Sequence, residues 1–153
     1  MINKPIKRTE ALQPLSREHH HSLLLCWKIR TGFALGVAPE RMKKYINWFF
    51  DNYLKNHFAV EEKYIFPILG NDNELIIKAI EQHRELEYLF NKKDELKETL
   101  LLIEKNLHQH IRFEERVIFN KTQNIASESQ LEAISEHHDE EKFFEYTTDV
   151  FWK

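Results

Sequence analysis

Residues 57–66 read HFAVEEKYIF, and residues 110–119 read HIRFEERVIF. Both stretches begin with a histidine, carry two adjacent glutamates in the middle and end in Ile-Phe. Side chains four residues apart lie on the same face of a helix, so the histidine and the first glutamate of each stretch present an imidazole and a carboxylate side by side. Two such pairs in matching apolar frames predict one site to which both stretches contribute.

The composition favours long helices. The chain of 153 residues has 3 Gly and 4 Pro, whereas Leu, Glu, Lys, Ile and Phe are plentiful. At this length one core is expected, and folding buries roughly two thirds of the surface that an unfolded chain exposes. We therefore predict a single all-α domain over residues 1–153.

Apolar residues recur with a helical period in four long stretches of the sequence. We expect helices at about residues 15–34, 39–66, 74–91 and 96–120. Helices of similar length joined by short connections predict an up-down-up-down four-helix bundle, here over about residues 12–120. Metal ligands on facing helices meet in the core of such a bundle.

The end of the second helix and a further C-terminal segment are also predicted. Pro67 and Gly70 are expected to stop the second helix, because proline lacks an N–H donor and glycine favours helix ends. A shorter C-terminal helical extension, at about residues 127–150, is expected to pack outside the bundle and to include Phe143 and Phe144.

Several functional classes are excluded or disfavoured. The formal net charge is -3, and the basic residues are spread along the chain without the stripe that neutralises phosphates, so no nucleic-acid partner is expected. Cys26 is the only cysteine, which excludes an internal disulfide and a Cys-rich zinc site. No stretch resembles a targeting signal or approaches the roughly 20 apolar residues of a membrane span. We expect a soluble, cytoplasmic monomer or homodimer that does not bind membranes.

Histidines on the buried faces are the strongest indication of chemistry. His57, His83 and His110 fall within the apolar stripes of the second, third and fourth predicted helices. Buried imidazoles need partners for their ring nitrogens, and a metal ion supplies such partners together. The first helix offers three consecutive histidines about 100° apart, so no more than one points squarely inward. His19 lies closest to the apolar stripe, and His20 is the alternative. His21 is expected at the surface.

Glutamates complete the predicted site. Glu61 and Glu114 share the inward face with their histidines, whereas the glutamate after each is rotated toward the rim. Glu87, four residues after His83, is either a further ligand, a partner of a ligand or a surface residue. The remaining histidines are expected at the surface: His108, His137 and His138. Four histidines and two glutamates suit a pair of iron ions, with manganese or zinc as alternatives, and carboxylates are able to bridge two ions.

A simpler interpretation competes with the metal site. One His-Glu pair four residues apart is usually an exposed helix pair that contributes about 0.2 to 0.5 kcal/mol. A histidine on an apolar face is usually a core residue with satisfied hydrogen bonds. The duplication of the pair, together with matching histidines on the other two helices, favours the metal site.

Four segments together resemble the hemerythrin-like, or HHE cation-binding, family: LSREHHHSL at 15–23, HFAVEEKYIFP at 57–67, EQHRELEYL at 81–89 and HIRFEERVIF at 110–119. The two HxxxEE stretches followed by Ile-Phe are its specific part. The resemblance implies a four-helix bundle that holds a non-haem di-iron centre. It implies the ligands His57, Glu61, His83, His110 and Glu114, completed by His19 or His20.

Two departures from the family pattern bear on function. Oxygen-carrying hemerythrins have a second histidine four residues after that of the third helix, where this chain has Glu87, and their last carboxylate is an aspartate five residues after its histidine, where this chain has Glu114 at four. A carboxylate-rich site argues against oxygen storage and toward redox, peroxide, nitric oxide or iron handling.

Three functional hypotheses follow. The leading one is a di-iron protein that binds or senses dioxygen or a related small diatomic, or takes part in an iron-linked stress response. The second is a di-iron oxidase or a nitric oxide or peroxide reductase that uses the same ligands. The third is a metal-free helical interaction module. We favour a metal- and oxygen-binding protein over an enzyme.

Overall fold

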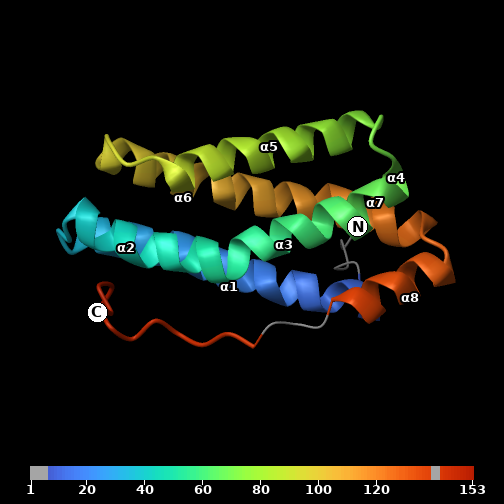
Figure 1. The fold of residues 1–153 in the computed structure, drawn as a ribbon, viewed down its shortest axis with the longest axis horizontal. Coiled ribbons are helices and arrows are strands. Elements are labelled where there is room, and N and C mark those ends of the chain that lie inside the picture. The colour runs from blue at the N-terminus through green and yellow to red at the C-terminus, as the bar shows by residue number, and fades with distance from the viewer. Residues whose placement is uncertain (1–6, 139–141) are drawn as a thin grey trace, which may run out of the picture.

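The computed structural model describes residues 7–138 and 142–153, and within these residues every regular element is a helix. The predicted all-α class is therefore confirmed. Five helical rods follow one another along the chain (Figure 1). The first rod is α1 (Gln13–Ala34), which a short 3₁₀ turn, η1 (Glu10–Leu12), precedes.

The second rod is continuous, although its hydrogen-bond pattern changes along its length. It alternates α-helix with π-helical turns in the order α2 (Pro39–Phe49), η2 (Phe50–Leu54), α3 (Lys55–Val60), η3 (Glu61–Ile65) and α4 (Phe66–Leu69). The expected stop at Pro67 is wrong, because this proline lies in the first turn of α4, where a missing N–H is tolerated. The rod ends at Leu69, before Gly70 with its φ of 98°.

The remaining rods begin at polar caps or tight turns. The third rod begins after Asn73, whose side chain accepts a hydrogen bond from the Leu75 N–H at 2.8 Å. The last begins after Ser127, which forms a capping box with Gln130. The elements are α5 (Glu74–Asn91), then α6 (Leu96–Phe113), η4 (Glu114–Ile118) and α7 (Phe119–Ile125) as one continuous rod, and α8 (Glu128–His137). The fourth rod thus continues past its expected end near residue 120.

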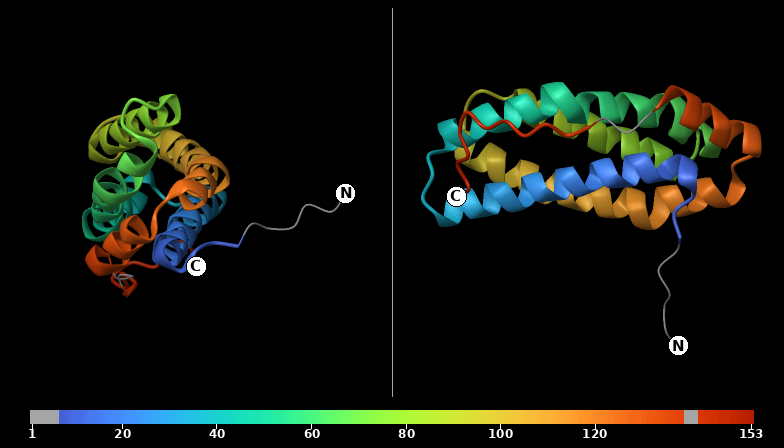
Figure 2. Two further views of the ribbon diagram at one scale, coloured as in Figure 1. Left: turned by 90° about the vertical axis from the view of Figure 1, so that its right-hand side faces the viewer. Right: turned by 90° about the horizontal axis from the view of Figure 1, so that it is seen from below.

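The four longer rods lie side by side, and consecutive rods run in opposite directions (Figures 1 and 2). α6 packs along both α1 and α5, while α8 packs on η1 and η3. The interior contains two apolar clusters. One is rich in aromatic residues, such as Tyr45 and Phe49, and the other includes Leu15, Ile65 and Phe119. The buried histidines of the rods fall in the sequence between members of these two clusters, so polar side chains are concentrated at one level of the core.

The C-terminal segment corrects one expectation. Helix α8 ends at His137, and residues 142–153 contain no helix, so Phe143 and Phe144 do not continue it; residues 139–141 of the expected extension lie outside the described residues. Side-chain docking explains the difference. Glu145 contacts Lys28 of α1 at 2.7 Å, and Phe151 is buried close to Gly32, where a Cβ atom would lie 2.9 Å from the Phe151 ring. Contacts with α1 and α2 thus determine the path of this segment, which does not form the expected helix.

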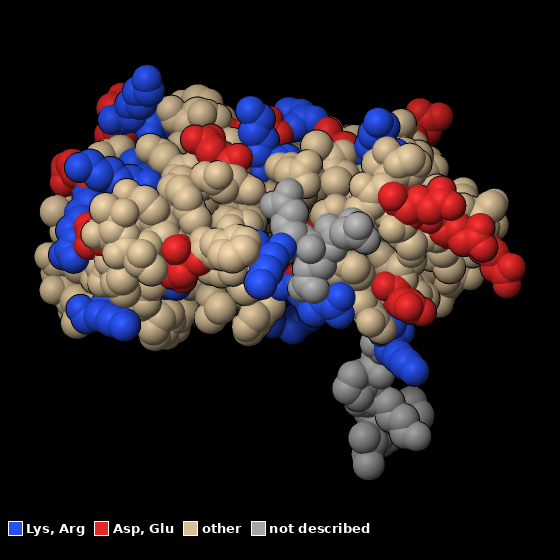
Figure 3. Space-filling view, turned by 60° about the horizontal axis from the view of Figure 1, so that its bottom comes forward, with Lys and Arg blue, Asp and Glu red and all other residues tan. Residues whose placement is uncertain are grey.

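The surface of the molecule carries both signs of charge. On the face shown in Figure 3, acidic side chains gather at the right-hand end, both signs are mixed over the rest, and the described basic side chains form no continuous band. In the part of the chain that the structure describes, no helix combines the length and apolar character needed to cross a membrane.

Candidate metal centre

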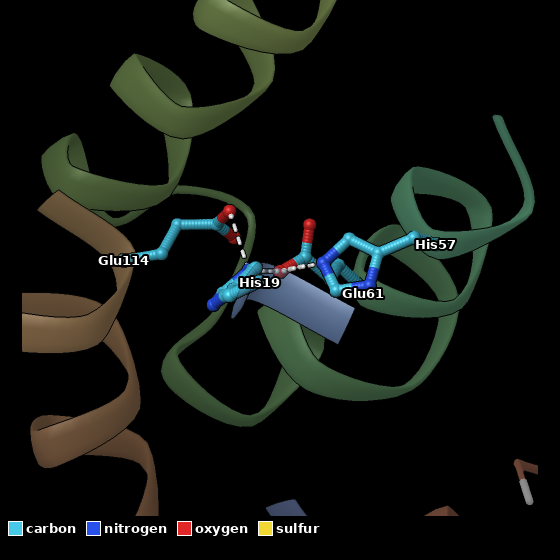
Figure 4. Close-up of side chains that lie close together, drawn as sticks. All are labelled: His19, His57, Glu61 and Glu114. Carbon is cyan, nitrogen blue, oxygen red and sulfur yellow. Dashed lines mark ion pairs between the residues drawn. The ribbon is translucent and has the colours of Figure 1, made fainter. Parts of the chain in front are cut away.

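Six side chains from four rods converge in the core, and none is more than 3 % exposed. They are His19 of α1, His57 of α3, Glu61 of η3, His83 of α5, His110 of α6 and Glu114 of η4. In Figure 4, the imidazoles of His19 and His57 lie beside the two carboxylates. All six belong to the set of ligands predicted from the sequence, and the two repeated stretches contribute to one cluster.

The two glutamates lie between two pairs of histidines. Glu61 places Oε2 at 3.2 Å from the Nε2 of His57 and Oε1 at 3.1 Å from the Nε2 of His83. Oε1 of Glu114 lies 2.6 Å from the Nε2 of His110 and 3.5 Å from that of His19. Ligand atoms about 2.1 Å from an ion and at right angles to each other are about 3 Å apart, so these separations suit metal coordination.

The cluster divides into two groups of possible ligands. One contains His19, His57 and both glutamates, and the other contains His83, His110 and the same glutamates. Within each group, one ligand atom per residue lies within 4.8 Å of the others. Because both groups share both carboxylates, the arrangement fits two adjacent ions with bridging glutamates.

The buried polar atoms of the cluster support this interpretation. The Nε2 atoms of the four histidines and both carboxylate oxygens of each glutamate are buried and face one another, but none makes a well-aligned hydrogen bond. A buried polar atom whose hydrogen bonding is not satisfied costs free energy, so eight such atoms in one cluster need an explanation. Metal ions would satisfy all of these atoms at once.

The opposite nitrogen of each imidazole is held by a side chain outside the cluster. The Nδ1 atoms of His57 and His83 lie 2.7 and 2.8 Å from carboxylate oxygens of Glu18 and Glu62. The other two Nδ1 contacts are His19 to Glu115 at 3.1 Å and His110 to the Gln82 side-chain oxygen at 2.6 Å. An ionised carboxylate or an amide oxygen only accepts hydrogen bonds, so these contacts place a proton on Nδ1 and leave Nε2 as the nitrogen that could bind a metal.

Both glutamates of the cluster begin a π-helical turn, and this turn explains the Ile-Phe ending of the repeated stretch. The N–H groups of Phe66 and Phe119 donate to the carbonyls of Glu61 and Glu114, five residues earlier. A five-residue turn returns these phenylalanines to the buried face, whereas a regular α-helix would rotate them away. The Phe66 ring stacks on His83 with centroids 5.3 Å apart, and that of Phe119 stacks on His19 at 5.1 Å. The repeat therefore encodes both the candidate ligands and their packing.

In the metal-free cluster, the pKa shifts favour a protonated His57 and His83 beside a charged Glu61. Burial lowers the pKa of His57, but the charge of Glu61 and the contact with Glu18 outweigh it and raise the pKa to about 9. Burial also lowers the pKa of His83, but the contacts with Glu61 and Glu62 outweigh it and raise the pKa to about 9. Burial raises the pKa of Glu61, yet the neighbouring His57 holds it well below its usual value. Metal binding would thus replace protons on the imidazoles.

Two predicted residues lie outside the cluster. His20 is exposed, so His19 is the histidine of α1 that points inward. The carboxylate of Glu87 is half-buried and contacts Arg84, and it is not among the described groups that could hold an ion. The role of the converging residues as ligands stays a prediction, with the choice on α1 narrowed to His19.

One histidine expected at the surface is buried. His138, at the end of α8, places Nε2 at 2.9 Å from Glu18, and the other carboxylate oxygen of Glu18 contacts His57. Burial raises the pKa of Glu18, but the hydrogen bonds from His138 and His57 overcome this effect and lower it to about 2. Sequence reasoning missed Glu18, Gln82 and His138. Glu62 and Glu115, in contrast, could have been recognised by their shared place in the repeat.

Fold and site together define an all-helical domain with a buried cluster of histidines and glutamates that could hold metal ions. The family model described as the hemerythrin HHE cation binding domain matches residues 10–101, and the chain belongs to this family. No curated protein and no solved structure matches the chain. The matched region includes His19, His57, Glu61 and His83. The place of His110 and Glu114 in the cluster rests on the structure.

Proposed function

We propose that this protein is a cytoplasmic, non-haem di-iron protein that binds or senses dioxygen or a related small diatomic. The observation that carries the proposal is the buried set of four imidazole nitrogens and four carboxylate oxygens that face one another without well-aligned hydrogen bonds. An N/O set of this kind suits iron, and membership of a cation-binding family supports a metal in this place. We interpret the four longer rods as the up-down-up-down bundle of such a domain, with α8 as an additional helix.

Each residue has a role in this proposal. His19 and His57 would hold one ion, and His83 and His110 the other. Glu61 and Glu114 would contribute to both. The pair of irons, when bound, supplies reversible redox chemistry and coordination positions that the protein leaves open to a small ligand.

The surrounding side chains keep the site dry and rigid. Phe58 stacks on His83 with centroids 3.9 Å apart, and Phe66 and Phe119 cover other imidazoles. The Nδ1 partners fix the orientation of each ring. A core packed this closely with aromatic rings favours a diatomic over an organic substrate.

A second candidate function is a nitric oxide or peroxide reductase or an oxidase that uses the same ligands. The observation that favours it is the set of carboxylates outside the cluster: Glu18, Glu62 and Glu115 each contact an imidazole. Carboxylate partners raise the basicity of a histidine ligand and stabilise oxidised iron. Net consumption of nitric oxide or peroxide in the presence of a reductant would select this function over reversible binding.

An absorption spectrum tests the leading function. Protein loaded with iron(II) without oxygen is expected to gain near-ultraviolet and visible bands in air, and reversible loss of these bands after oxygen removal would indicate binding or sensing. Glu87→Gln is a matched control, because this glutamate lies outside the cluster. A spectrum that stays unchanged in air, from protein with full iron content, would overturn the proposal.

A further inference from the structure

A small cavity lies on the His57 side of the metal centre, between α1 and the second rod. Its volume is about 20 Å³. Buried Ser22, Leu54 and His57 line its inner part, and half-buried His21, Tyr53 and Phe143 line its outer part. The cavity therefore extends from near the surface to the imidazole of a predicted ligand.

The shape of this cavity depends on a π-helical turn that the metal centre does not explain. Turns η3 and η4 begin with the glutamates of the cluster, whereas η2 contributes no residue to it. Two residues of η2, Tyr53 and Leu54, instead form part of the cavity wall. Single π-helical turns occur frequently at functional sites, and this one widens the rod one turn before His57.

The outer wall comes from the C-terminal segment. The Phe143 ring stacks on His21 with centroids 4.3 Å apart and lies 4.9 Å from the Tyr53 ring. The Tyr53 hydroxyl accepts a hydrogen bond from the Phe144 N–H at 2.9 Å. Phe143 is thus held across the outer part of the cavity by contacts with α1 and η2.

We propose that this cavity is an access pocket through which one small, uncharged diatomic molecule passes the His57 ring to the metal centre. The proposal rests on the function proposed above. A cavity needs about 10 to 15 Å³ on this measure to hold a water molecule, so the pocket admits one molecule of that size and excludes organic substrates. Its wall is mostly apolar, with Phe49, Leu54 and Phe143, which suits an uncharged gas, although the polar residues Glu18, His21 and Ser22 also line it.

Two substitutions change the pocket in opposite directions. Ser22→Val fills its inner part, and Phe143→Ala opens its outer part. Phe144→Ala is the matched control, since the neighbouring Phe144 side chain is 65 % exposed and its contact with Tyr53 uses the backbone. Phe143 lies in a segment without helix, so its variant keeps the test valid if the Ser22 variant does not fold.

The test is the association rate of nitric oxide with iron(II)-loaded protein, measured by stopped flow, with iron content measured in parallel. We expect at least a tenfold slower rate for Ser22→Val, a faster rate for Phe143→Ala and an unchanged rate for Phe144→Ala, all with wild-type iron content. Xenon under pressure is expected to occupy the pocket in a crystal of the wild type but not of Ser22→Val.

The outcomes separate the two proposals. Equal association rates in all variants with full iron content would overturn the access pocket and leave the proposed function intact. A pocket that holds water and no xenon, with rates independent of Ser22 and Phe143, would likewise overturn it. Failure of the wild type to bind iron or nitric oxide would overturn both proposals.

Discussion

The two repeated stretches have the same pattern of ligands but different surroundings. His57 and His110 each precede a glutamate of the cluster by four residues, and both glutamates begin a π-helical turn. The Nδ1 of His57 contacts the Glu18 carboxylate, however, whereas that of His110 contacts the neutral amide of Gln82. Sequence repetition thus gives two similar sets of ligands, while the facing rods make them electrostatically unequal.

The inequality extends to the two proposed ion positions. His19 and His57 are both held by carboxylates, Glu115 and Glu18. His83 has the carboxylate of Glu62, and His110 has an amide. Because a carboxylate partner makes an imidazole a stronger donor, the position beside His57 is expected to favour oxidised iron more than the other. The proposed access pocket is also on this side, since His57 is one of its lining residues.

Removal of a shared glutamate is expected to have the largest effect on metal content, because it takes a ligand from both proposed ion positions at once. Glu61→Ala and Glu114→Ala should each lower the content of both ions and remove the stability that metal binding adds, about 2.7 kcal/mol at a metal concentration about 100 times Kd. Elemental analysis and thermal unfolding with and without metal measure this, with Glu87→Ala as the control. Unchanged metal content in both variants would mean that these carboxylates are not ligands.

A pH change sharpens the contrast between the metal-free and metal-bound states. In the metal-free fold the pKa of His57 and of His83 is raised to about 9, against about 6.5 in an unfolded chain. Their protonation stabilises the fold fully below about pH 6.5, and this stabilisation is lost as the pH rises through about 9. Metal affinity should increase over the same range, since fewer protons compete. The increase in unfolding temperature that metal produces should therefore be larger at about pH 9 than at about pH 6.5. An increase of the same size at both pH values would contradict the expectation.

Substitution of the residues that contact Nδ1 tests whether the two proposed ion positions differ. Glu18→Gln keeps a hydrogen-bond acceptor but removes its charge, so the affinity of one ion should fall about 10-fold to 100-fold. Gln82→Glu adds a charge beside His110 and should strengthen the other position. Anaerobic titration with iron(II) would resolve two steps if the positions differ. Identical effects of both variants on both steps would show that the positions are equivalent.

The smallest effect is expected at His138, two contacts away from the cluster. His138→Ala removes the hydrogen bond that His138 donates to the Glu18 carboxylate and should weaken iron binding less than about 10-fold. His138→Asn retains a donor and should restore most of this loss. The exposed neighbour provides the control variant, His137→Ala. The same iron affinity in the Ala and Asn variants would argue against a positioning role.

Much of the fold and the cluster could be predicted because the relevant pattern is local. Residues four apart share a helix face whatever the helix packs against, so His57 with Glu61 and His110 with Glu114 are visible in the sequence. The sequence ranked His19 ahead of His20 but left both open, because the choice depends on the rotation of α1 about its own axis. Duplication within the chain, more than any single residue, made the buried His/Glu cluster predictable.

The contacts that distinguish the two halves could not be predicted, because each joins different rods. Glu18 reaches His57 from α1, and Gln82 reaches His110 from α5. The π-helical turns were also missed, since helical periodicity was assumed to be constant. Phe143 was assigned to a helix because its neighbours have helical spacing, but docking on Tyr53 and His21 determines its position.

The central claim is that two ions share the glutamates of one buried cluster. Anomalous diffraction at the iron edge from crystals of iron-loaded protein tests it directly. We predict two peaks, each about 2.0 to 2.2 Å from two imidazole Nε2 atoms, one pair being His19 and His57 and the other His83 and His110, with both peaks bound by Glu61 and Glu114. A single peak, a peak elsewhere, or imidazoles turned away from the carboxylates would contradict the account.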